Sequence, residues 1–181
     1  MSHADYRKKI ELSSRNKGLF IRPMKENDIA KIVARYSFPW STLKKAQEIW
    51  KTYCCEQQAG THTVALLEEG DEILGYGSLL RRSECPYFAS SNIPEVHALW
   101  IDESHRRQGL RKALVQWIES LAIEEGYKQI GIGVGLYRDY GPAQKLYFRL
   151  GYIPEGSGIT YKGQPTTPGQ MYPLDDDLNC S

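Results

Sequence analysis

The chain has 181 residues, of which 41% are hydrophobic and 25% are charged. These are globular proportions, and the length suits one domain with a single sizeable core. The 23 Lys and Arg residues nearly balance the 22 Asp and Glu residues, so the formal net charge is only +1. This balance argues against a protein whose main task is to coat nucleic acid or an anionic membrane, because such a protein needs a large basic excess.

Targeting segments and metal motifs are not evident in the sequence. No stretch approaches the roughly 18 consecutive apolar residues that span a bilayer, and the N-terminus lacks the apolar run of a signal peptide. The four cysteines form no CxxC motif and lie near no pair of histidines, so neither a disulfide framework nor a metal site is predicted. We expect a cytoplasmic protein with no metal, no nucleic-acid partner and no membrane contact. Residues 1–17 are interpreted as a flexible extension and residues 18–181 as one domain.

Hydrophobic periodicity predicts an α/β domain in which helices cover a mixed sheet. In the first half of the chain it predicts a strand end at 19–21, a helix over 29–36, a second helix beginning at 41 or 42, and strands at 62–68 and 72–81. A polar loop at 86–94 and a strand at 96–101 are predicted next. They are followed by a long helix from 107 or 108 to Gly126, a strand at 128–135 and a helix at 141–150. One or two short strands are expected after Gly151.

The junction between the strand at 96–101 and the long helix carries the clearest chemical signal. No acidic residue occurs between Glu103 and Glu119, although the first turns of the helix hold four cations, Arg106, Arg107, Arg111 and Lys112. A helix N-terminus already carries partial positive charge, so this cluster favours a bound polyanion such as a cofactor diphosphate. Gly109 would let the backbone approach such an anion closely. The alternative is that these are solvated side chains on an exposed helix end.

Two segments in the expected register resemble the GCN5-related N-acetyltransferase (GNAT) superfamily. Leu99-Trp100-Ile101 followed by Arg106-Arg107-Gln108-Gly109-Leu110-Arg111 is similar to the family's strand end and Q/R-x-x-G-x-G/A motif. Residues 143–152, AQKLYFRLGY, are similar to its A-x-x-L-Y-x-x-L-G-F/Y segment. The order of elements fits over residues 18 to about 155. Arg111 departs from the motif, because the family usually has a second small residue there.

The resemblance implies a central mixed sheet flanked by helices and a specific cofactor, acetyl-CoA. The pantetheine arm would lie against Leu99, Trp100 and Ile101 like an added strand. The diphosphate would bind the backbone and cations of the junction, namely Arg106, Arg107, Gln108, Gly109, Leu110, Arg111 and Lys112. The implied reaction moves the acetyl group to a primary amine of a small molecule or protein by direct attack in a ternary complex.

The resemblance also implies two catalytic residues. Tyr147 corresponds to the tyrosine that protonates the departing thiolate, and Glu95 corresponds to a glutamate that serves as general base. From the residues alone, Glu95 could instead be a solvated loop carboxylate, and Tyr147 could simply pack against the sheet. His97 is a rival base on the same face of the strand as Glu95, or else a core histidine. Tyr140 stands where many members carry an Asn that contacts pantetheine.

Glycines alternate with other residues at 131, 133 and 135, so one face of a strand there would carry no side chains. Either a helix packs tightly against that face or a ligand passes close to the backbone.

The acceptor is less well specified by the sequence. The region where the family admits it contains several aromatic residues and an acidic run, namely Tyr36, Phe38, Trp40, Tyr161, Tyr172 and Asp175–Asp177. Aromatic rings beside carboxylates suit a cationic amine such as a polyamine, an aminoglycoside or a protein N-terminus, although the acidic run could also be merely solvated. A non-catalytic acyl-CoA sensor is the alternative function. The exposed aromatic residues allow a homodimer without requiring one.

Overall fold

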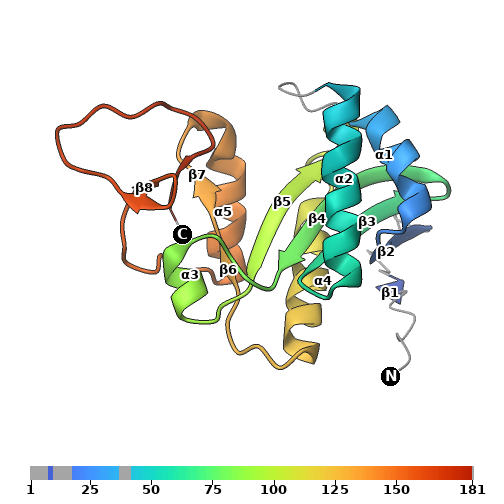
Figure 1. The fold of residues 1–181 in the computed structure, drawn as a ribbon, viewed down its shortest axis with the longest axis horizontal. Coiled ribbons are helices and arrows are strands. Elements are labelled where there is room, and N and C mark those ends of the chain that lie inside the picture. The colour runs from blue at the N-terminus through green and yellow to red at the C-terminus, as the bar shows by residue number, and fades with distance from the viewer. Residues whose placement is uncertain (1–7, 10–17, 37–41, 181) are drawn as a thin grey trace.

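The computed structural model describes residues 8–9, 18–36 and 42–180, arranged as two sheets with helices packed around them (Figure 1). The larger sheet has six strands, in spatial order β1 (Lys8–Lys9), β2 (Leu19–Pro23), β3 (His62–Glu69), β4 (Glu72–Leu80), β5 (Glu95–Ile101) and β6 (Gly131–Ile132). Neighbouring strands are antiparallel except for β5 and β6, which are parallel. β5 therefore lies inside the sheet, as its apolar sequence predicts.

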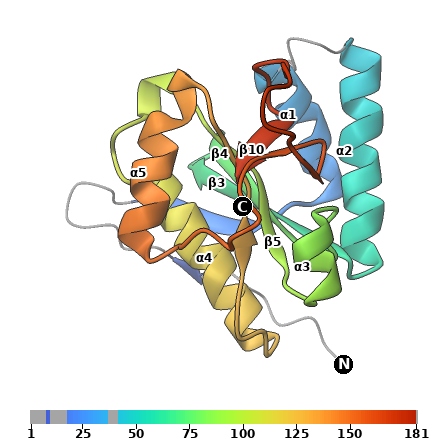
Figure 2. The ribbon, with the colours of Figure 1, turned by 90° about the vertical axis from the view of Figure 1, so that its left-hand side faces the viewer.

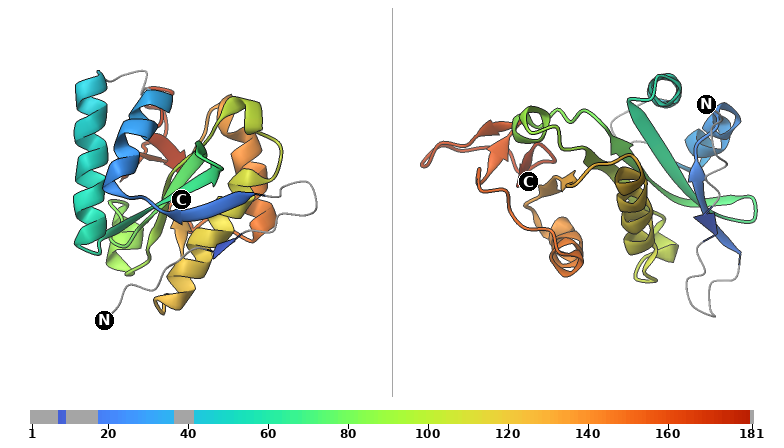
Figure 3. Two further views of the ribbon diagram at one scale, coloured as in Figure 1. Left: turned by 90° about the vertical axis from the view of Figure 1, so that its right-hand side faces the viewer. Right: turned by 90° about the horizontal axis from the view of Figure 1, so that it is seen from below.

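The smaller sheet has four short strands, in spatial order β7 (Val134–Gly135), β10 (Leu178–Cys180), β8 (Thr160–Tyr161) and β9 (Gln164–Pro165). It lies beside the short helix α3 (Pro86–Ser90), at the end of the molecule away from β1 (Figure 3). The prediction of a continuous strand over 128–135 is wrong, because the chain leaves one sheet at Gly133 and enters the other. The prediction of a loop at 86–94 also missed α3, which begins at Pro86.

Helices cover the two faces of the larger sheet (Figure 2). One face carries α1 (Ile29–Arg35) and α2 (Leu43–Gln58), and the other carries α4 (Leu110–Glu124) and α5 (Gly141–Leu150). The predicted periodicity of the long helix is confirmed, since its apolar residues Leu110, Ala113, Leu114, Trp117, Ile118, Leu121 and Ala122 are all buried. Each face has its own hydrophobic cluster, so the sheet separates two cores.

Within the described part of the chain, none of the helices has the length and apolarity that a membrane crossing requires. That same part brings no three His, Cys, Asp or Glu side chains together as metal ligands would be.

An ion pair fixes the entry into α1. The guanidinium of Arg22 donates to both carboxylate oxygens of Asp28, at 2.6 and 2.9 Å, and the backbone amide of Lys25 donates to the same carboxylate at 2.8 Å. Burial alone would raise the pKa of Asp28, but these hydrogen bonds hold it below its ordinary value. The pair therefore stabilises the fold only while Asp28 is ionised.

We expect Asp28→Asn to cost about 2 kcal/mol of stability at pH 7, because the charged hydrogen bonds to Arg22 weaken. The pKa of Asp28 is lower in the folded chain than in the unfolded one. Its contribution is therefore complete above an unfolded pKa of about 3.9 and is lost as pH falls below that value. Urea unfolding between pH 7 and pH 2.5 should show the gap between wild type and variant closing below pH 4. A gap that stays constant would contradict the prediction.

Candidate active site

The two parallel strands β5 and β6 separate soon after they meet. They pair only at Glu95 with Gly131 and at Val96 with Ile132. Beyond Gly133 the chain forms β7, which pairs with β10 rather than with β5. Along this edge, the part of β5 after Val96 therefore has no strand partner in the described residues, and its backbone is open to an added extended chain.

A β-bulge in β5 decides which side chains face which core. Tyr76 pairs with Trp100 and Ser78 pairs with His97, so β5 carries one extra residue against β4. Ala98 lies in the bulge with a φ of 51°. Beyond it, Leu99 and Ile101 belong to the core under α4, whereas Ala98 and Trp100 pack in the core under α1 and α2.

The side chains of the strand end are used for packing, and only their backbone edge remains for a ligand. Trp100 lies edge-on to Tyr36 with ring centroids 3.8 Å apart, within an aromatic cluster that includes Tyr76. A Cβ at Gly77 would lie 2.5 Å from Cδ2 of Leu99, so the absence of a side chain at Gly77 leaves room for the Leu99 side chain. For the predicted contact of pantetheine with residues 99–101, the structure offers this open backbone edge.

The junction from β5 to α4 exposes a run of backbone amides. The helix begins at Leu110, after the predicted 107 or 108, because Arg107 and Gly109 have φ values of 65° and 83° and delay the helix. The first hydrogen bond of the helix runs from the amide of Ala113 to the carbonyl of Gly109, at 3.1 Å. The amides of residues 107–112 therefore make no hydrogen bond within the described part of the chain. Consecutive free donors at a helix N-terminus are the arrangement that favours binding of an anion.

The cations of the junction differ in their surroundings. Arg107 and Lys112 are exposed. Arg106 donates to the carbonyl of Ile101 at 3.2 Å and pairs with Glu103 at 3.2 Å. The Glu103 side chain is 83% exposed, so this ion pair is weak and does not block the amides.

Asp102, at the end of β5, does not compete for these amides. Hydrogen bonds from Ser104, together with His105 and Arg35, lower the pKa of Asp102 to about 2. Its second carboxylate oxygen pairs with Arg35 of α1 at 2.9 Å. Asp102 thus holds the 3-10 turn Glu103–His105 and ties the junction to α1.

Tyr147 lies on α5, on the α4 side of the sheet, and is only 7% exposed. Burial raises the pKa of its hydroxyl, and the neighbouring guanidinium of Arg111 acts in the opposite direction. Arg111 is the residue that departs from the family motif. The structure thus places it against the predicted acid, where it links the junction to α5.

Glu95 and His97 face the opposite side of the sheet from Tyr147, toward α2. One carboxylate oxygen of Glu95 accepts a hydrogen bond of 2.5 Å from Ser83. The other points toward the separating strands, since a Cβ at Gly133 would lie 3.7 Å from it. The His97 ring lies 6.3 Å, between centroids, from the ring of His62 on this side of the sheet, and alternation along the strand predicts the same face for Glu95.

The bare face of the glycine run is occupied by aromatic rings rather than by a closely packed helix backbone. A Cβ at Gly131 would lie 2.4 Å from the ring of Phe88, and one at Gly135 would lie 2.6 Å from the ring of Tyr140. Tyr140 also donates a hydrogen bond of 3.0 Å to Asp176. The residue at the family's Asn position therefore connects α5 to the C-terminal strands.

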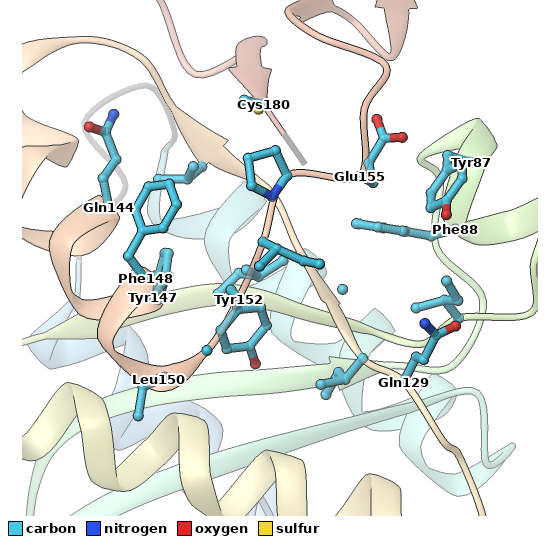
Figure 4. A pocket seen from close by; sticks show the side chains of 18 of the residues that line it. Tyr87, Phe88, Gln129, Gln144, Tyr147, Phe148, Leu150, Tyr152, Glu155 and Cys180 are labelled. Atoms are coloured by element: carbon cyan, nitrogen blue, oxygen red, sulfur yellow. The ribbon is translucent and has the colours of Figure 1, made fainter.

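A cavity of about 650 Å³ lies between β6, α3 and α5 (Figure 4). Figure 4 shows Gln144, Tyr147 and Phe148 of α5 on one side, and Phe88 and Gln129 on the other. None of residues 99–112 lines this cavity. The cavity and the run of free amides are thus different features, and Tyr147 lines the cavity while it interacts with Arg111 of the junction.

The residues predicted to lie near the acceptor amine have three different kinds of surroundings. Tyr36 is a core residue, 6% exposed, whose hydroxyl donates to the carbonyl of Ile73 at 2.9 Å. Phe38 and Trp40 lie outside the described residues. The acidic run is bonded rather than merely solvated, because Tyr161 donates to Asp175 at 3.4 Å and Tyr137 donates to Asp176 at 2.5 Å.

Residues 27–152 match the model of the acetyltransferase (GNAT) family. The chain belongs to this family. It is 30% identical over 84 residues to the uncharacterized N-acetyltransferase YsnE of Bacillus subtilis (strain 168), a match that covers 46% of this chain and about half, 51%, of that relative.

Solved structures of GNAT proteins share the fold at low identity. One is the acetyltransferase of Salmonella typhimurium that modifies the N-terminal serine of 50S ribosomal subunit protein L7/L12. It has a TM-score of 0.64 at 15% identity, covering 91% of this chain and 92% of that chain. Another is the aminoglycoside N-acetyltransferase AAC(6')-Iy in complex with CoA. It has a TM-score of 0.64 at 15% identity, covering 78% and 92%.

One feature near the candidate site that the sequence analysis missed is the histidine pair on the α2 side. His62 looks like one polar residue at the start of an apolar strand, yet it is 1% exposed and bonded to Glu56. The only signal in the sequence was the presence of two histidines, His62 and His97, at the same end of two predicted strands.

Proposed function

We propose that this GNAT protein transfers an acetyl group from acetyl-CoA to a primary amine of a small molecule or protein, by direct attack in a ternary complex. The observation that carries the proposal is the run of six free amides at residues 107–112, next to the open edge of β5. A diphosphate fits this site, because it supplies two charges to a helix N-terminus that is flanked by arginine and lysine side chains.

The residues that would hold acetyl-CoA form two groups. The amides of residues 107–112 and the side chains of Arg106, Arg107 and Lys112 would bind the diphosphate. The backbone edge of residues 99–101 would pair with the pantetheine arm. When bound, acetyl-CoA supplies an activated acetyl group and a thiolate leaving group.

The proposed proton-transfer residues approach this edge from opposite faces of the sheet. Glu95, from the α2 side, takes a proton from the acceptor amine, which is protonated at neutral pH. Ser83 holds one oxygen of Glu95 and leaves the other facing the gap between the strands. Tyr147, from the α4 side, donates a proton to the departing sulfur. The cofactor in the gap would thus separate the base from the acid.

An amine acceptor is supported by the structural relatives. One of them modifies the N-terminal serine of a ribosomal protein, and another is named as an aminoglycoside N-acetyltransferase. In this chain, carboxylates and tyrosines of the C-terminal strands would attract such a cation. A panel that contains small-molecule amines and peptide N-termini decides which class this chain acetylates.

Ligand-induced stabilisation tests the cofactor site first. At about 100 times its dissociation constant, acetyl-CoA should add roughly 2.7 kcal/mol to the free energy of unfolding. Dephospho-CoA keeps the diphosphate and should also stabilise the protein, whereas pantetheine lacks it and should not. Absence of any shift with acetyl-CoA would remove the cofactor assignment. Release of free thiol in the presence of a panel of amines would then distinguish an enzyme from an acyl-CoA sensor.

A further inference from the structure

A buried histidine links the acceptor side of the sheet to the surface. His62, at the start of β3, is 1% exposed, and its Nδ1 lies 2.9 Å from a carboxylate oxygen of Glu56 on α2. Its other ring nitrogen, Nε2, is buried and has no hydrogen-bond partner among the described residues. The Glu56 side chain is 40% exposed, so the far end of this pair reaches solvent.

His97 of β5 presents a matching unpaired atom. Its Nδ1 is buried without a hydrogen-bond partner within the described structure, and its ring centroid lies 6.3 Å from that of His62. This separation is too long for a direct hydrogen bond between the rings and suits one bridging water. Two unpaired buried nitrogens also need such a water, since leaving each of them unsatisfied is costly. His97 as a whole is only partly buried, and its Nε2 is not among the buried nitrogens that lack a partner in the described structure.

The proposed reaction requires a route for a proton, and the inference here rests on that proposed function. An alkylammonium ion and acetyl-CoA give an acetamide, the free thiol of CoA and one proton. The amine nitrogen loses two protons in total, and the sulfur gains one of them. The other must reach solvent in every turnover, although the acceptor and the cofactor would cover Glu95.

We propose that His97, a bridging water, His62 and Glu56 form a path that carries this proton from the acceptor side to solvent. Nε2 of His97 receives the proton from Glu95 through the water of the acceptor site, and Nδ1 passes a proton to the bridging water. Nε2 of His62 receives it, and Nδ1 passes a proton to Glu56, which releases it to solvent. Exchange with solvent resets both ring tautomers. His62 and Glu56 are positioning residues, because they act through His97.

The surrounding charges suit this role. Glu56 and Tyr53 face His62 from α2, His97 faces it from β5, and Arg81 approaches it from the end of β4. Arg81 is itself neutralised by Glu125 at 2.5 Å. Burial lowers the pKa of His62 and Glu56 opposes this effect, so His62 is neutral at pH 7 and can accept a proton.

Replacement of Glu56 by Gln tests the path by its pH profile. With the amine that releases thiol fastest in the panel, Glu56→Gln should lower kcat/KM by about tenfold at pH 7. It should also move the acid limb of the profile to lower pH, because removing an anion makes the imidazoles less basic. A purely structural effect would lower the rate equally at every pH. A wild-type rate and acid limb in Glu56→Gln would overturn the proposal.

The matched control is Tyr53→Phe, whose ring also packs against His62, at 4.7 Å between centroids, without lying on the path. It should keep the wild-type profile. The stabilisation by acetyl-CoA should be the same in all three proteins, which separates failure of the path from failure of the cofactor site.

Histidine tautomers, measured by nitrogen NMR without any acceptor, give a second readout. His62 and His97 should both carry their proton on Nδ1 in the wild type, and His97 should shift to the Nε2 tautomer in His62→Phe. If wild type acetylates no amine but these tautomers are found, the proposed function fails and the hydrogen-bonded path stands. If His97 has the same tautomer in both proteins, the path is overturned whatever the activity.

Discussion

Tyr147→Phe is expected to lower kcat by roughly tenfold to a thousandfold, which overlaps the roughly hundredfold to ten-thousandfold that a positioned general acid contributes. The variant keeps the buried ring and loses only the hydroxyl that would donate a proton to the departing sulfur. The fold and the stabilisation by acetyl-CoA should therefore be unchanged. Single-turnover measurements, in which chemistry limits the rate, give the decisive value.

The breadth of this range follows from the acidity of the groups. A tyrosine with a pKa near 10 is a weaker acid than a thiol near 8.5, so complete proton transfer costs about 2 kcal/mol. Burial raises the pKa of Tyr147 and increases that cost, whereas the Arg111 guanidinium reduces it. We therefore expect Arg111, at a position where the family usually has a small residue, to favour proton donation by Tyr147.

Tyr152→Phe is the matched control for this prediction. The Tyr152 ring lies 5.9 Å from that of Tyr147 and lines the same cavity, but it is not assigned to the acid role. We expect it to retain wild-type kcat. Equal turnover by wild type and Tyr147→Phe in the single-turnover regime would refute the assignment, and equal losses in both variants would show that the effect is one of packing.

The elements that bury a regular apolar pattern were predictable from the sequence. Leu114, Ile118 and Leu121 recur at helical spacing and lie in the core under α4, because a helix that buries one face has little choice of residue type there. The start of the same helix was predicted two or three residues early. A left-handed φ at Arg107, a residue other than glycine, has no hydrophobic signal, so periodicity cannot detect it.

The internal geometry of the site was less predictable because it depends on residues far apart in the chain. Alternation along β5 would put Glu95 and Ile101 on one face, but the bulge at Ala98 separates them. In the sequence, the bulge is indicated only by the two glycines Gly75 and Gly77 of the neighbouring strand β4. The strand predicted over 128–135 is divided because its second half pairs with residues 178–180, which no local pattern can indicate.

The contact of Arg111 with Tyr147 could not be derived from either motif alone. Each motif predicts a position on its own helix, and only the packing of α5 against α4 brings the two side chains together. The two motifs therefore predicted the residues of the candidate site, whereas the contact between Arg111 and Tyr147 required the fold.

Gly109→Asp is expected to weaken acetyl-CoA binding by about a hundredfold, with a loss of stability no larger than that of Gly109→Asn. Gly109 has a φ of 83°, a conformation that Asn and Asp tolerate better than other side chains, and its Cβ would meet no atom within 4 Å. A carboxylate at this helix N-terminus is favourable in the absence of ligand. With a diphosphate charge about 6 Å away and an effective dielectric constant of about 20, it repels the ligand by about 3 kcal/mol.

The variant Gly109→Asn distinguishes the effect of side-chain charge on acetyl-CoA binding from the effect of side-chain size. It has nearly the same size and backbone preference as Asp but no charge, so we expect its affinity for acetyl-CoA to fall by less than tenfold. Gly126→Asp, at the other end of α4 with a φ of 88° and equal free space, should bind acetyl-CoA as the wild type does. Calorimetric titration measures all four proteins. Equal affinities for Gly109→Asp and wild type would mean that the free amides of the junction do not bind the diphosphate. If they did bind it, a negative charge among them would weaken the binding.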